Sequence, residues 1–386
     1  MKHLSRVVIA MALTVTGLAT AQTTQEADTT KSEKLDAVLV KAVRVNAKSP
    51  ITHSNLTKEE IAKRNLGQDI PMLLNFLPSV VTTTDAGAGI GYTGLRVRGV
   101  SSQSTNVTIN GIPYTDAESL GTFWVNLGDF SSSVESLQLQ RGVGTSTNGS
   151  GAFGASINVL TDAVSKESSG EISNSIGSFN SRKHTVKFST GLMNDHFEIA
   201  GRLSNIQSDG YIDRATSDLK SYFLQGAYVD DNTLIKAVTF GGNNVTYQSW
   251  FGIDKATLRE NRTFNPAGQY EDENGVTQFY DNEVDDYRQD HYQLHWNQRY
   301  NRNWSTNIGL NYTYGRGFFE QFKEDDDFST YGFDELTVDG QTVNTTDVIR
   351  RRWLDNDYYV FNASANYKNR NLDMIFGTSI SHYDGD

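Results

Sequence analysis

The residues that offer chemistry in this chain are few, and their spacing argues against catalysis. His291 and His295 have the spacing of a helical metal-binding pair, but they lie in a run that alternates like a strand. At about 3.4 Å per residue a strand would hold them roughly 13 Å apart, too far to share one ion. Gly149-Ser150-Gly151 lacks the spacing of a nucleophile elbow. We therefore predict that the protein is not an enzyme and has no metal site or cofactor.

Charged clusters are the next candidates for binding. Glu324–Asp327 and the pair Asp285-Asp286 offer the hard oxygen ligands that Ca²⁺ prefers. We favour solvated loops for them. Arg350–Arg352 would attract an anionic ligand such as a ferric chelate, and here we favour charges at the end of a loop. The formal net charge of −12 argues against nucleic acid as a partner.

A glycine-rich stretch at residues 137–161 has the order strand, loop, strand. Its loop glycines are Gly142, Gly144, Gly149, Gly151 and Gly154. A phosphate-binding loop would need Gly-Lys-Ser/Thr opening a helix, whereas Gly154 leads into the strand-like run Ile157–Thr161. Nucleotide binding is therefore not expected.

The N-terminus has the form of an export signal. Residues 1–21 combine Lys2, His3 and Arg6 with an apolar run of about 13 residues and an Ala-Thr-Ala end, which predicts a cleaved signal peptide. Residues 22–34 are polar and without periodicity, so they predict a flexible leader. The chain has no Cys, which excludes disulfides and a lipoprotein anchor.

Two short helices and several short strands are expected next. Thr57–Glu60 has the form of a capping box. A second helix should begin near Asp69 with Pro71 in its first turn and end at Pro78. Residues 79–163 then hold short strands separated by glycine-rich turns. Phe123–Val125 lies in an aromatic loop that either touches a ligand or packs on the wall.

From about residue 168 the pattern changes to long alternating runs. These runs cover 184–190, 197–204, 292–297, 307–314 and 359–366. With their flanks they supply the roughly 9–11 residues of a tilted membrane strand. Short links alternate with long ones at about 254–286 and 317–354, which is typical of outer-membrane barrels. The alternative is a soluble β-sandwich.

Two motifs resemble the plug domain of TonB-dependent outer-membrane receptors. The first is an Arg-Gly strand followed by a hydrophobic-Asn-Gly-hydrophobic-Pro turn, with Asn110 where Asp is commoner in the family. The second is Arg-Gly, a Gly-Ser-Gly-Ala-X-Gly run and an Ile-Asn strand. The motif residues are Arg96, Arg98, Gly99, Asn110, Gly111, Arg141, Gly142, Gly149, Gly151, Gly154 and Asn158.

The resemblance implies a TonB box in the region 35–45. The matching segment comprises Asp36, Ala37, Val38, Leu39, Val40, Lys41 and Ala42, with Lys41 where Thr is common in the family. Such a box adds itself as a strand to a periplasmic TonB-type energy-coupling protein, which works with an inner-membrane motor. The alternative is a first strand of the plug. The implied plug domain spans 46–163 and the implied barrel portion spans 164–386.

The implied fold is mostly β, with an α+β plug followed by a partial antiparallel transmembrane β-barrel. Intact barrels of this kind have about 22 strands. We count roughly nine or ten here, so we expect a fragment that does not transport by itself. Arg96, Arg98 and Arg141 are expected to hold the plug by pairing with barrel carboxylates such as Glu198, with ligand contact as the alternative.

The implied function is import of a scarce ligand across the outer membrane, with a ferric siderophore or other iron chelate preferred. Cobalamin, haem and glycans are alternatives within the family. A passive porin or an adhesin is the alternative from another class. The implied partners are the coupling protein, a small-molecule metal chelate and outer-membrane lipid.

Overall fold

A computed structural model describes residues 44–45, 50–144 and 153–385. The predicted signal peptide, leader and TonB box lie outside these residues, as do Gly149 and Gly151. Within the described ranges, no helix is both long enough and apolar enough to cross a membrane.

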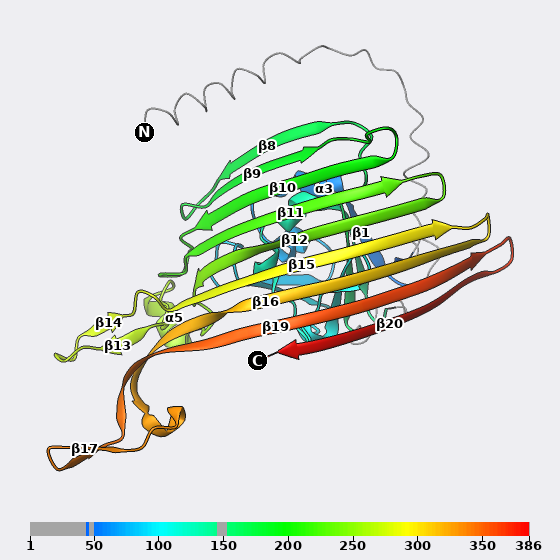
Figure 1. Cartoon of the computed structure of the whole chain (residues 1–386). Coiled ribbons are helices and arrows are strands. Elements are labelled where there is room, and N and C mark those ends of the chain that lie inside the picture. Colours follow the sequence, from blue (N-terminus) through cyan, green and yellow to red (C-terminus); the bar gives the residue numbers. More distant parts are fainter. Residues whose placement is uncertain (1–43, 46–49, 145–152, 386) are drawn as a thin grey trace, which may run out of the picture.

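One large antiparallel sheet dominates the structure (Figure 1). Its nine strands are β8 (Ser169–Ile176), β9 (Arg182–Ser189), β10 (Phe197–Ser208), β11 (Ser217–Val229), β12 (Thr233–Tyr247), β15 (Val284–Arg299), β16 (Trp304–Asp327), β19 (Thr345–Lys368) and β20 (Asp373–Gly385). Each strand pairs with its neighbour in sequence, and β8 and β20 form the two edges. Each predicted alternating run contributes to one of these strands, so the mostly-β fold with a partial barrel is confirmed.

The two faces of the sheet differ because side chains alternate along each strand. On β10, Phe197, Ile199 and Leu203 are exposed on the convex side, whereas Glu198 and Arg202 are buried on the concave side. An apolar outer face with a polar inner face is the pattern of a membrane barrel wall.

Aromatic rings form rows across the outer face. Tyr292, Tyr312 and Tyr359 stack on neighbouring strands with ring centroids 5.9 and 5.0 Å apart. Trp304 and Tyr367 pair near the opposite ends of their strands at 5.0 Å. The eight-residue step from Trp304 to Tyr312 corresponds to about 26 Å along a strand, or roughly 20 Å vertically at a tilt near 40°. This height is of the same order as the roughly 25 Å apolar band of outer-membrane barrels.

Short turns and long loops lie at opposite ends of the sheet. Residues 230–232, 300–303 and 369–372 form the short turns. The loop 248–283 carries α5 (Lys255–Glu260), β13 (Gln269–Glu271) and β14 (Thr277–Phe279). The loop 328–344 carries η6 (Phe328–Tyr331), β17 (Leu336–Val338) and β18 (Gln341–Val343).

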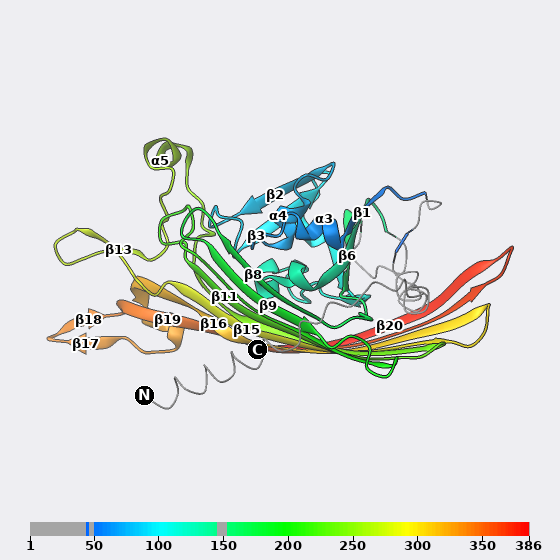
Figure 2. The same ribbon diagram turned by 90° about the horizontal axis from the view of Figure 1, so that it is seen from above.

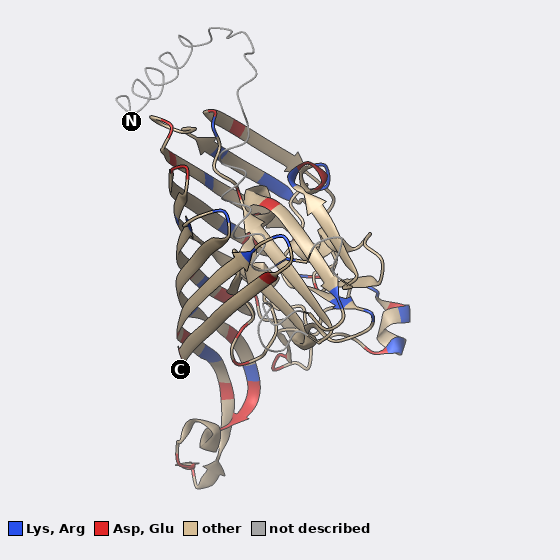
Figure 3. Cartoon of the chain, turned by 90° about the vertical axis from the view of Figure 1, so that its right-hand side faces the viewer, with Lys and Arg blue, Asp and Glu red and all other residues tan. Residues whose placement is uncertain are grey.

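The expectation that 317–354 forms one loop was wrong. β16 and β19 remain paired far beyond the aromatic rows, so Glu324–Asp327 and Arg350–Arg352 lie on strands. The pairing brings opposite charges together, and Arg351 Nε lies 2.5 Å from Glu320 Oε2. Figure 3 marks these acidic and basic residues on the arm that extends beyond the sheet.

The plug lies on the concave side of the large sheet (Figure 2). Its main sheet has the order β1 (His53–Thr57), β6 (Val134–Arg141), β7 (Ala155–Thr161), β4 (Thr105–Ile109) and β5 (Ile112–Pro113). β2 (Val80–Thr84) and β3 (Thr93–Val97) form a separate hairpin. Short 3₁₀ turns occupy η2 (Ser102–Ser104), η3 (Trp124–Leu127) and η4 (Phe130–Ser133).

Local signals in the sequence account for much of the plug. α3 (Lys58–Ala62) begins with the predicted capping box between Thr57 and Glu60, which is confirmed. α4 (Ile70–Leu74) ends earlier than predicted, and Asp69 does not cap it. The Asp69 carboxylate instead accepts a hydrogen bond from Thr93 Oγ1 at 2.9 Å, which ties α4 to β3.

Candidate functional site at the plug–barrel interface

The plug and the barrel wall share one hydrophobic core. Phe130 of η4 is 2 % exposed, and its ring lies 4.9 Å from that of Phe240 and 6.4 Å from that of Phe223. Both partners are inward-facing residues of the barrel sheet. Burying an aromatic ring contributes about 1.5–3 kcal/mol, so the wall supplies part of the stability of the plug.

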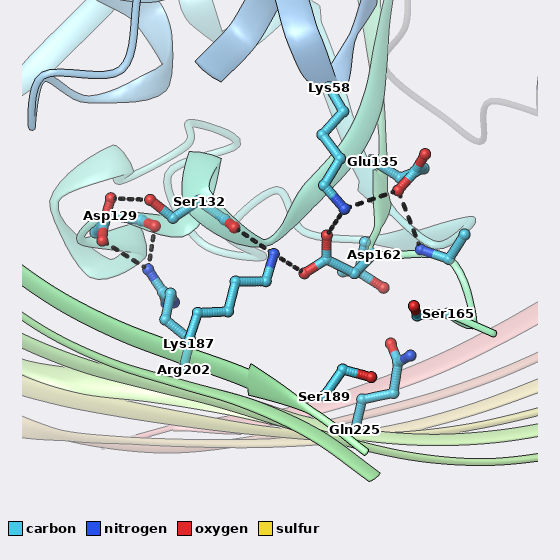
Figure 4. Close-up of polar contacts among 12 residues, drawn as sticks. Lys58, Asp129, Ser132, Glu135, Asp162, Ser165, Lys187, Ser189, Arg202 and Gln225 are labelled. Carbon is cyan, nitrogen blue, oxygen red and sulfur yellow. Dashed lines mark hydrogen bonds and ion pairs between the residues drawn. The ribbon is translucent and has the colours of Figure 1, made fainter. Parts of the chain in front are cut away.

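Asp129 is the centre of the first polar contact between the two parts (Figure 4). It has a left-handed backbone (φ 50°) just before η4. Lys183 Nζ lies 2.7 Å from Asp129 Oδ1, and Arg202 Nη1 lies 3.4 Å from Oδ2. Both cations belong to the barrel. The hydroxyls of Thr185 and Ser204, also on the barrel, donate to Oδ2 at 2.6 and 2.7 Å.

The Asp129 carboxylate is fully buried, so its charge state matters for docking. Burial by itself would raise its pKa, but Arg202 and Lys183 outweigh burial and hold the pKa at about 2. The carboxylate is therefore ionised at neutral pH, and its hydrogen bonds and ion pairs offset the cost of removing it from water.

Asp162 is the centre of the second polar contact. Lys58 of the plug and Lys187 of the barrel place their Nζ atoms 2.7 and 2.6 Å from its two carboxylate oxygens. Burial would raise the pKa of Asp162, but Lys187 and Lys58 lower it below its usual value. Lys187 also donates to the carbonyl of Ser132 at 2.9 Å, and Lys236 donates to the carbonyl of Asp162 at 2.6 Å. Figure 4 shows Lys187 bridging the two contacts.

Asn110 makes a third contact from the predicted β4–β5 turn. Asn110 (φ 54°) and Gly111 (φ 79°) both have left-handed backbones, which confirms the predicted Asn-Gly hairpin. Asn110 Oδ1 accepts from the amide of Thr161 at 3.0 Å, and Asn110 Nδ2 donates to Gln293 Oε1 of the barrel at 3.1 Å. The amide thus joins the plug turn to the wall.

The arginines of the plug motif do not pair with Glu198. Arg96 and Arg98 are exposed, and Arg141 donates within the plug to Pro78 O at 2.9 Å and Ser54 Oγ at 2.8 Å. Glu198 instead accepts from Ser189 and Gln225 of the barrel and from the amide of Ser165. The expected polarity was therefore wrong, because at this interface the plug supplies carboxylates and the barrel supplies cations.

Gly142 and Gly154 join the ends of two plug strands. The amide of Gly142 donates to Gly154 O at 2.8 Å, and the amide of Gly154 donates to Ser104 O at 2.9 Å. A Cβ at Gly154 would lie 2.8 Å from Ser104 O, so only glycine fits there. Asn158 accepts from Thr108 Oγ1 at 2.7 Å between the parallel strands β7 and β4. Gly99 (φ 76°) lies in an exposed turn.

Arg44 and Val45 adjoin the segment where the TonB box is predicted. Arg44 donates to Ser136 O at 2.8 Å and to Asn158 O at 2.7 Å. The amide of Val45 donates to Gln138 Oε1 at 3.0 Å, and Gln138 Nε2 donates back to Val45 O at 2.9 Å. This segment is therefore hydrogen-bonded to β6 and β7. In the sequence, Asp129 precedes β6 and Asp162 follows β7.

His291 and His295 make structural contacts within the barrel wall. His291 stacks on Phe240 with centroids 4.5 Å apart and shares a hydrogen bond with Thr313 at 2.8 Å. His295 contacts Gln293 at 3.2 Å. In the part of the chain that the structure describes, no group of three His, Asp or Glu residues is placed to hold a metal ion.

This structure has a curved sheet with an α+β domain docked on its concave face (Figure 2), which is the architecture of plugged β-barrels. Comparison with known families agrees, because residues 45–156 match the TonB-dependent receptor plug domain. Residues 45–156 thus carry the plug domain of this family, and the chain has the architecture of the N-terminal part of a TonB-dependent receptor, a plug followed by a partial barrel. This class of protein consists of receptors and transporters, not enzymes.

Related sequences and structures give the same assignment. The chain is 27% identical over 231 residues to the ferrienterobactin receptor of Escherichia coli, covering 54% of this chain and 30% of that protein. It is 25% identical over 266 residues to the probable TonB-dependent siderophore receptor PirA of Acinetobacter baumannii, covering 62% and 33%. The chain thus spans about a third of the length of these relatives.

Solved structures share the fold. The closed form of the ferric-catecholate import receptor Fiu from E. coli superposes with a TM-score of 0.63 at 15% identity, covering 88% of this chain and 47% of that one. The siderophore receptor PirA from A. baumannii superposes with a TM-score of 0.57 at 16% identity, covering 86% and 48%.

Proposed function

We propose that the protein is an outer-membrane receptor that imports a ferric siderophore or another iron chelate. The plug docked against the inner wall through Asp129 and Asp162 carries the proposal, because a passive porin needs no such domain in its lumen. The siderophore receptors among the relatives support iron as the cargo.

The TonB box is proposed to transmit force from the periplasmic coupling protein. The predicted box at Leu35–Ala42 ends two residues before Arg44, and Arg44 and Val45 are hydrogen-bonded to β6 and β7. A pull on the box would therefore act on the two strands that run beside the docking contacts. The apolar outer face of the sheet would contact lipid.

Two measurements test the proposal in cells that carry the intact gene. Iron limitation should raise the abundance of the protein in the outer-membrane fraction and permit uptake of a radiolabelled ferric chelate. Deletion of residues 35–42 should abolish uptake and leave surface binding intact, whereas deletion of residues 22–29 in the leader should change neither. Uptake that survives loss of the box would refute the coupling assignment, and a lack of response to iron would refute iron as the cargo.

A further inference from the structure

A cavity separates the plug from the barrel wall at the long-loop end. Its volume is about 440 Å³. Tyr92 and residues 116–126 of the plug form one side, and β15, β16, β19 and β20 form the other together with the loop after β12. Six aromatic residues line it: Tyr92, Phe123, Trp250, Tyr287, Phe319 and Tyr383. By the loop rule for outer-membrane barrels, this end faces outside the cell.

All the charged residues that line the cavity are acidic. They are Asp116, Glu118 and Asp285, and no Lys or Arg is among the described lining residues. A cation does stand nearby, since the Arg352 guanidinium lies 5.8 Å from the ring centroid of Phe319. Arg352 itself does not line the cavity, so the walls remain net negative.

Asp285 is built into the site and incompletely satisfied. Its residue is 6 % exposed, and one carboxylate oxygen accepts from the hydroxyl of Tyr92. The other oxygen, Oδ1, is buried and has no hydrogen-bond partner among the residues that the structure describes. Leaving a buried charged acceptor unpaired is costly, so a donor from a ligand would be stabilised there.

The remaining acids frame the cavity on the plug side. Asp116 Oδ1 accepts from the amide and the hydroxyl of Ser119, both at 2.7 Å, which fixes the loop that carries Glu118. Glu118 lines the cavity from the plug side and Tyr383 lines it from the opposite wall. The acids are too dispersed to form a metal site. Aromatic faces combined with carboxylates are the surroundings that favour an organic cation.

Resting on the proposed function, we propose that this receptor takes an iron chelate that presents a positively charged amine, with the cavity holding that ammonium group between Asp285, Glu118 and the aromatic rings. A ferric tris-catecholate carries a net negative charge and would be repelled by the same walls. The cavity therefore sets the charge class of the ligand.

A pair of probes that differ in one charge tests this. The first is a ferric trihydroxamate with a free pendant ammonium, and the second is the same complex with that amine acetylated. Binding to the intact purified receptor is followed by quenching of tryptophan fluorescence, since Trp250 lines the cavity. We expect the ammonium form to bind about tenfold more tightly, and Asp285→Asn to remove most of that difference. Asp254→Asn removes the same charge from the loop that precedes β15, keeps the helix cap of α5, and should change nothing.

Each outcome of these binding experiments supports or overturns a different part of the proposal. Equal affinity for the two forms, or tighter binding of a ferric tris-catecholate, would overturn the charge assignment and leave iron import standing. If no ferric chelate binds, phenethylammonium serves as an iron-free probe. If phenethylammonium binds and Asp285→Asn weakens that binding, the cation site is supported although the iron function fails. If phenethylammonium does not bind either, both the cation site and the iron function are overturned.

Discussion

Replacing Asp129 by Asn should loosen the plug strongly, because the change leaves Arg202 and Lys183 buried without their counter-charge. The side chains of Asp129, Lys183 and Arg202 are 0, 3 and 1 % exposed. Removing one partner of such a buried pair costs about 3–5 kcal/mol. The pKa of Asp129 gives a separate figure, since a carboxyl at about 2 instead of its usual 3.8 contributes about 2–3 kcal/mol. We therefore expect a loss of about 3 kcal/mol.

Hydrogen exchange of the intact receptor in detergent measures this loss. Peptides that cover β6 (Val134–Arg141) should exchange about 100-fold faster in Asp129→Asn, because each 1.4 kcal/mol corresponds to a factor of about ten. Asp195→Asn, at an exposed turn where Asn tolerates the left-handed backbone, serves as the control and should have no effect. Adding Lys183→Met and Arg202→Met to Asp129→Asn should restore part of the protection, since no buried charge then lacks a partner.

The pH dependence of plug stability follows from the direction in which the pKa of Asp129 is shifted. The folded pKa lies below the unfolded one, so the contribution of Asp129 is complete above about pH 4 and is lost as the pH falls towards about 2. Cleavage of the wild-type plug by pepsin should accelerate over that window and approach the rate of the Asn variant. Protection of β6 in Asp129→Asn within about threefold of wild type at pH 7 would refute the role assigned to this ion pair.

Three further changes probe other contacts of the interface. Asn110→Ala should cost about 2–3 kcal/mol because it loses three side-chain hydrogen bonds and strains a left-handed residue, and the same exchange experiment on β4 measures it, with Asn110→Gly relieving the strain alone. Phe240→Ala should cost about 3–5 kcal/mol, lowering the thermal midpoint of the intact receptor, whereas Leu224→Ala on the outer face should spare the plug. Arg44→Met should leave ligand binding unchanged and reduce uptake, because three hydrogen bonds that fasten the pulled segment are lost.

The elements that the sequence predicted are those set by local forces. Alternation along β10 or β15 is decided by neighbouring residues, so the strands and their outward faces followed from the period. The capping box at Thr57 and the Asn-Gly turn at Asn110 are equally local. The extents of β16 and β19 were not predictable in this way, since their last residues are polar and are held in strands by pairing with each other.

The ion pairs of the interface could not be predicted because their partners come from distant parts of the chain. Lys183 and Arg202 lie 54 and 73 residues from Asp129, and nothing near Asp129 marks it as buried. A usable signal did exist on the barrel side. Lys183, Lys187 and Arg202 all occupy inward positions of alternating strands, where a cation must meet a carboxylate or water.

On β12 and β15 the inner-wall charges differ between the two ends of the barrel, and this bears on how a cationic ligand would pass. Asp285 stands second on β15, at the long-loop end, whereas Lys236 stands near the start of β12, at the short-turn end. While the plug is docked, Asp162 and the carbonyls beside it cover the wall lysines. Displacing the plug would uncover Lys187 and Lys236 beneath the acidic cavity. A positively charged chelate would then meet like charges below the cavity, so these lysines would weaken its retention in the lower lumen and also oppose its entry there.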